Sequence, residues 1–114
     1  MNSTNKNWTY NQFLAFLLIH LAAADYKFSQ DEINFIKSLT GDVSFDEIRE
    51  LLDKSSDYEI IQTIMSYKDE FYPGEEDKAK IVEDMKGLFL SDSKFSLNEQ
   101  NLFRALKELL NSLK

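Results

Sequence analysis

The chain has 114 residues, of which 43% are hydrophobic and 13% aromatic, so it can bury one core and its length fits a single domain. It carries 13 Lys and Arg against 20 Asp and Glu, and the resulting net charge of −7 would repel a phosphate backbone, which disfavours nucleic acid as a partner. Cysteine is absent, which excludes disulfides, thiolate metal ligands and thiol nucleophiles.

The N-terminal segment MNSTNKNWTYNQ is polar and lacks the apolar stretch of a signal peptide, so we expect a cytoplasmic protein. We expect residues 1–8 to be loosely ordered, with Trp8 docking onto the first helix. The apolar run FLAFLLIHLAAA, residues 13–24, is shorter than the ~20 residues that span a bilayer and predicts a buried central helix. Its His20 is interpreted as a packed, hydrogen-bonded core histidine, because no cysteine or second histidine is present to complete a zinc set or a Cys/His pair.

Five predicted helices, including this first one, open with capping boxes, in which a Ser or Thr and a Glu or Gln three residues later satisfy amide donors at the helix start. The pairs, in chain order, are Thr9/Gln12, Ser29/Glu32, Ser44/Glu47, Ser56/Glu59 and Ser96/Glu99. Apolar residues recur after these starts at spacings of three and four, and no run alternates as a strand does.

Between the fourth and fifth of these starts, FYPG at residues 71–74 interrupts the chain. The acids that follow it favour a new helix, which should end near Leu90. The sequence therefore predicts an all-α fold without linkers: one domain over residues 1–114, built as a bundle of about six helices with an internal pseudo-twofold repeat.

The repeat consists of ADYKFSQDE, residues 24–32, which returns as SDSKFSLNE, residues 91–99. Both contain Asp-x-Lys-Phe-Ser-x-x-Glu. In each copy the Ser can cap the next helix, and the Asp can close an Asx turn after the preceding one. Two helical hairpins related by a pseudo-twofold axis are the natural inference.

A metal site is the alternative interpretation of the repeat. An EF-hand is excluded, because neither copy has Gly at the sixth position of the loop or Glu at its last. A different kind of site, built from oxygen ligands, is kept as an alternative if the axis brings Asp25 and Asp92 together, since hard cations need several converging carboxylates. Turn and cap chemistry is the favoured interpretation.

The chain also resembles a known family. A helix that ends in Ala-Ala-Asp, a short turn, an apolar residue, Ser, and Glu three residues further on, all repeated near the C-terminus, resembles the TerB-like family. This family includes the tellurite-resistance TerB proteins and the related domain of a membrane-bound DnaJ-like co-chaperone. The resemblance covers about residues 13–110 and includes VSFDEIRELL. Where the family usually has Gly directly after the Asp, this chain has Tyr26 and Ser93.

The resemblance implies an all-helical protein linked to stress responses and to membrane-associated complexes. It also implies acidic residues that bind metal, and the positions that would carry them are Asp25, Glu32, Asp92 and Glu99. We therefore predict a non-enzymatic protein-interaction or scaffold module in a tellurite or other stress response, without catalytic residues or a resident cofactor. The alternative is a small divalent-metal-binding protein that uses the repeated motifs.

The predicted partner is a protein with a basic surface. This protein could belong to a membrane complex with which the chain associates peripherally. We do not expect the chain itself to insert into a membrane. The residues predicted to contact it lie around FYPG: Phe71, Tyr72, Glu75, Glu76 and Asp77. Exposed aromatic residues beside acids can form a protein-binding rim. In the alternative interpretation, the two aromatic residues pack across the edge of the core.

Overall fold

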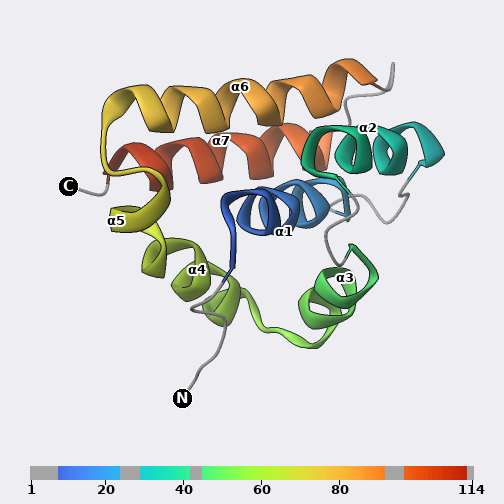
Figure 1. Cartoon of the computed structure of the whole chain (residues 1–114), viewed down its shortest axis with the longest axis horizontal. Coiled ribbons are helices and arrows are strands. Elements are labelled where there is room, and N and C mark those ends of the chain that lie inside the picture. The colour runs from blue at the N-terminus through green and yellow to red at the C-terminus, as the bar shows by residue number, and fades with distance from the viewer. Residues whose placement is uncertain (1–7, 24–28, 42–44, 92–96, 113–114) are drawn as a thin grey trace.

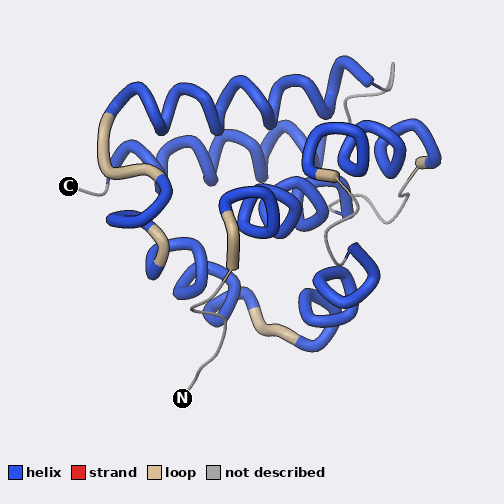
Figure 2. Tube along the Cα trace, viewed as in Figure 1, coloured by secondary structure: helices blue, strands red, loops and turns tan. Residues whose placement is uncertain are grey.

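The computed structural model describes residues 8–23, 29–41, 45–91 and 97–112. The regular secondary structure in these ranges is entirely helical (Figures 1 and 2). The helices are α1 (Tyr10–Ala22), α2 (Gln30–Thr40), α3 (Phe45–Lys54), α4 (Asp57–Ser66), α5 (Lys68–Phe71), α6 (Glu75–Ser91) and α7 (Leu97–Ser112). The predicted all-α fold is confirmed, and the short α5 is an addition to the predicted helices. In these ranges, no helix is long and apolar enough to cross a membrane.

Helix α1 is the centre of the molecule and contacts α2, α3, α6 and α7 (Figure 1). Its buried side chains surround the helix axis and comprise Phe13, Leu14, Ala15, Phe16, Leu17, Leu18, Ile19, Leu21 and Ala22. A helix that is apolar all round needs neighbours on every side, which is why the other helices wrap around it. The predicted buried central helix is confirmed.

Helices α6 and α7 lie side by side along one side of α1, and α3 and α4 lie on the other (Figure 1). Helix α2 packs closely against α6 at Gly87, where an added Cβ would lie 2.7 Å from Cζ of Phe35. Helix α2 ends at Thr40 and is followed by the C-cap Gly41, whose φ of 77° favours glycine because glycine lacks a Cβ.

Three of the predicted capping boxes are formed in full, at Thr9/Gln12, Ser29/Glu32 and Ser56/Glu59. In the second of these, the Glu32 amide donates to Ser29 Oγ over 3.1 Å, and the Ser29 amide donates to Glu32 Oε1 over 3.2 Å. The remaining two boxes depend on Ser44 and Ser96, which lie outside the described residues. The confirmed boxes explain where α1, α2 and α4 begin.

The Trp8 ring packs onto α1, as predicted. Its centroid lies 5.1 Å from that of Phe16, and it stacks on Tyr67 with a centroid separation of 5.8 Å. The preceding residues, 1–7, lie outside the described residues, so their predicted loose order stays a prediction. Trp8 thereby joins α1 to the junction between α4 and α5.

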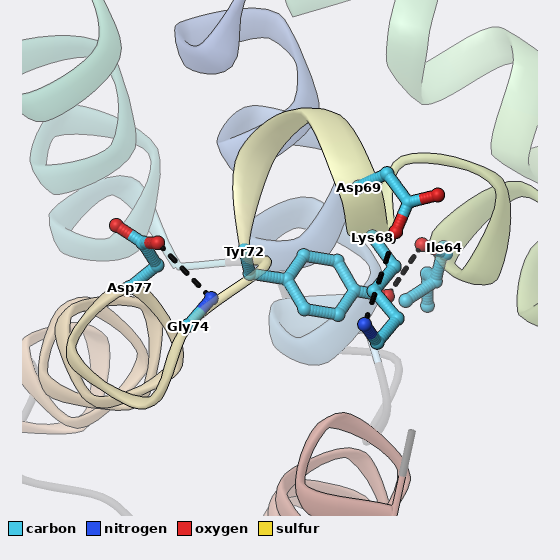
Figure 3. A network of polar contacts seen from close by, with 6 residues as sticks. All are labelled: Ile64, Lys68, Asp69, Tyr72, Gly74 and Asp77. Carbon is cyan, nitrogen blue, oxygen red and sulfur yellow. Dashed lines mark hydrogen bonds and ion pairs between the residues drawn. The ribbon is translucent and has the colours of Figure 1, made fainter. Parts of the chain in front are cut away.

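The aromatic residues near FYPG belong mainly to the core. Tyr72 is fully buried, and its hydroxyl donates to the carbonyl oxygen of Ile64 over 2.7 Å (Figure 3). Phe71 is half-buried, and its ring stacks on that of Tyr67 at 5.1 Å. The prediction of Tyr72 as a partner contact is corrected, because the core covers its ring. The alternative interpretation, in which Phe71 and Tyr72 pack across the edge of the core, describes both residues.

Candidate functional site

The two repeated motifs meet at a pair of glutamates. Glu32 lies in the first turn of α2 and Glu99 in the first turn of α7, at equivalent positions of the two copies. Each residue is only 2% exposed, and the two side chains share a hydrogen bond. Ionised carboxyl groups only accept hydrogen bonds, so this contact requires a proton on one of the two groups.

The environment of the pair holds that proton near neutral pH. Burial raises the pKa of the Glu32 carboxyl to about 7; the hydrogen bond that protonated Glu32 donates to Glu99 and the charge of Glu99 act in the same direction. The amide and hydroxyl of Ser29 oppose this, because they stabilise the ionised form of Glu32. A carboxyl group with a pKa near 7 readily exchanges its proton, which is typical of functional sites.

Of the four residues predicted to bind metal, the structure brings two together. Glu32 and Glu99 converge, whereas Asp25 and Asp92 lie outside the described residues. Among the residues that the structure describes, no group of three or more His, Cys, Asp or Glu could hold a metal ion. The observed pair nevertheless fits a hard cation in its chemistry, since it offers carboxylate oxygens from two separate helices.

The acids predicted to contact a partner lie at the start of α6. Glu75, Glu76 and Asp77 are exposed. The Asp77 carboxylate accepts a hydrogen bond from the Gly74 amide over 3.2 Å, and so satisfies a donor at the start of the helix (Figure 3). Their contact with a partner stays a prediction, as does that of the half-buried Phe71.

A second feature is an apolar groove of about 850 Å³ between α4 and α7, which we call the α4–α7 groove. Its lining residues come from α1, α4 and α7: His20, Asp57, Ile60, Ile61, Ile64, Leu102, Ala105, Leu106, Glu108, Leu109 and Ser112. Sequence reasoning missed this groove. One signal was present, because Ile61 and Met65 lie beside Ile60 and Ile64 and make the apolar stripe of α4 wider than one core face requires.

His20 lines this groove and is half-buried. Burial lowers the pKa of its imidazole, and the nearby charge of Asp57 partly offsets this. Among the described residues, no hydrogen bond of the His20 imidazole is found. The ring is packed, as predicted, and borders the groove between α4 and α7, while its predicted hydrogen bond stays a prediction.

Comparison with protein families gives a match over nearly the whole chain. A family model described as tellurite resistance protein TerB matches residues 11–112, which include both repeated motifs. Comparison with curated proteins returned no significant match, and neither did comparison with solved structures.

Proposed function

The chain belongs to the TerB family, and on that premise we propose that it is a non-enzymatic protein that binds a divalent cation where its repeated motifs meet. The observation that supports this proposal most directly is the contact between Glu32 and Glu99, two buried carboxyl groups at equivalent positions of the two repeated motifs. Capping alone does not require this arrangement. Glu59 makes the same capping box in α4 while exposed to solvent, so the burial and pairing of the two glutamates need a further reason.

A divalent cation supplies that reason, because it can neutralise both carboxylates and take their oxygens as ligands in place of the shared proton. Hard cations take about six or more oxygen ligands, so two glutamates are not a complete site. We expect Asp25 and Asp92 to contribute further carboxylates, together with backbone carbonyls and water. Their places in the repeated motifs, seven residues before each glutamate, support this expectation.

Thermal unfolding with and without Ca²⁺, Mg²⁺ or Mn²⁺, near neutral pH, tests the proposal. At a cation concentration ~100 times Kd, binding stabilises the folded state by about 2.7 kcal/mol, so the Tm should rise by several degrees. Glu32→Gln with Glu99→Gln should abolish the rise, as should Asp25→Asn with Asp92→Asn. Binding should also release a proton, which calorimetry in buffers of different ionisation enthalpy measures.

Glu59→Gln is the matched control, because it alters a capping glutamate that has no carboxyl partner among the described residues. This variant should keep the full cation-dependent rise in Tm. A Tm that none of the three cations changes at millimolar concentration would refute the proposal.

A protein-interaction role, in a tellurite or other stress response in the cytoplasm, is the second candidate. The α4–α7 groove favours it, since an uncovered apolar groove is a common kind of docking surface. The exposed acids at the start of α6 also favour it, because an acidic surface attracts basic partners.

A further inference from the structure

We propose that the α4–α7 groove binds an amphipathic helix of a partner protein, with Lys or Arg residues flanking the apolar face of that helix. The inference rests on the protein-interaction role and specifies both its site and the chemistry of its partner. It is independent of the cation site, because the lining of the groove includes neither Glu32 nor Glu99.

The walls of the groove suit the apolar face of a helix. Ile61 on α4 is 40% exposed, and Leu102 and Leu109 on α7 are only half-buried. An amphipathic helix places apolar side chains at spacings of three and four, and these can lie along such a groove between two helices. Docking would remove exposed apolar surface from water, which is the main favourable contribution to helix-in-groove binding.

The rims of the groove define the charge of the partner. Asp57 lies at the start of α4 and Glu108 on α7, and neither forms an ion pair among the residues described. The cations of α7 are placed elsewhere: Arg104 and Lys107 line a separate shallow depression. A helix in the groove would therefore have unpaired carboxylates on both sides, which favours flanking Lys or Arg.

The same charges disfavour a second copy of this chain as the occupant. The chain carries a net charge of −7, and a symmetric dimer would use the same groove on both copies. The acidic rims would then approach each other across the interface, with like charges opposed. A basic amphipathic helix has the complementary pattern.

A synthetic peptide with the sequence LKKLLKLLKKLLKL, labelled with a fluorophore, is the probe. Its scrambled counterpart has the same charge but no continuous apolar face, and it should bind at least about tenfold more weakly. Binding is measured by fluorescence anisotropy. His20 gives a local readout by NMR, because it is the one histidine of the chain and its imidazole signals should shift when the groove is occupied.

Two variants separate the groove from the general acidity of the surface. Ala105→Trp fills the groove from an exposed position of α7 without changing charge, and should weaken binding by about tenfold or more. Asp57→Asn with Glu108→Gln should weaken it about threefold or more. The matched control is Asp46→Asn with Glu50→Gln, which removes the same charge from exposed positions of α3 that do not line the groove, and should change the affinity by less than about twofold.

Each other outcome overturns the proposal in a distinguishable way. If the control weakens binding and Ala105→Trp does not, the chain keeps an interaction role but the groove is not its site. If the peptide does not bind at millimolar concentration, a basic helix is not the occupant. If sedimentation shows a dimer that Ala105→Trp dissociates, the occupant is a second copy.

Discussion

Glu32 is held between two opposing influences. On one side, the amide and hydroxyl of Ser29 stabilise its ionised form; on the other, burial and Glu99 stabilise its protonated form. The second influence is larger, since the pKa of Glu32 is raised to about 7. A glutamate that only caps a helix does not need to be buried beside a second carboxyl group. Because this burial brings the pKa of Glu32 close to neutral, a change of pH in that range should change the free energy of unfolding.

Glu32→Gln should reduce the dependence of stability on pH. Because the pKa of Glu32 is higher in the folded than in the unfolded state, the folded state binds the proton more tightly. The stabilisation is complete below the ordinary pKa of 4.5 and is lost as the pH rises through about 7. Gln keeps an oxygen for the Ser29 amide and cannot ionise. Between about pH 5 and pH 8, the wild type should therefore lose roughly 1 kcal/mol or more relative to this variant in urea unfolding.

Glu59→Gln is again the control for the loss of a capping carboxylate, because Glu59 makes the same capping box in an exposed position. Parallel curves for the wild type and Glu32→Gln would show that the pair does not titrate in this range, and would contradict the assignment.

At the scale of the element, helix starts follow from local chemistry and helix contacts do not. Ser29 and Glu32 are three residues apart, so the sequence predicts their mutual hydrogen bonds directly. The short α5 has no side-chain cap, and four residues contain too little periodicity to predict it. The approach of α2 to α6 depends on a missing side chain at Gly87, which a local pattern does not identify.

Gly87→Ala should destabilise the protein by about 1 kcal/mol. Alanine favours a helix by about 1 kcal/mol relative to glycine, but overpacking costs about 1–3 kcal/mol. Here the new Cβ would lie 2.7 Å from Cζ of the half-buried Phe35, so the clash should outweigh the gain in helix propensity. Denaturant unfolding measures the net effect.

The control for this contact is the same change in a Phe35→Leu background. The shorter side chain removes the opposing ring atom, so Gly87→Ala should there be neutral or stabilising. Equal destabilisation in both backgrounds would mean that Phe35 is not the obstacle.

At the scale of the whole molecule, the sequence predicts the centre better than the surface. The run from Phe13 to Ala22 is apolar on all sides, and burial is the one environment that suits it. The pairing of Glu32 with Glu99 and the opening between α4 and α7 depend instead on how distant helices pack. The repeat indicated that the two motifs were equivalent, but the contact between their glutamates required the tertiary structure.

Because α1 contacts helices on several sides, the described part of the chain should unfold as one cooperative unit. Leu17→Ala tests this, since Leu17 is fully buried in α1 and its truncation should cost about 2–5 kcal/mol. Leu90→Ala is the matched control: Leu90 is 87% exposed, so the same change should alter stability by less than about 0.5 kcal/mol.

The measurement uses two probes, one that reports on a single contact and one that reports on all the helices. Trp8 is the one tryptophan of the chain, and its fluorescence reports on the contact between α1 and Tyr67, whereas far-ultraviolet circular dichroism reports on all the helices. In urea, both probes should give the same midpoint in the wild type, and Leu17→Ala should lower both midpoints equally. If the fluorescence midpoint falls while the dichroism midpoint stays, the helices around Trp8 form a unit of their own, and α1 does not couple them to the rest of the molecule.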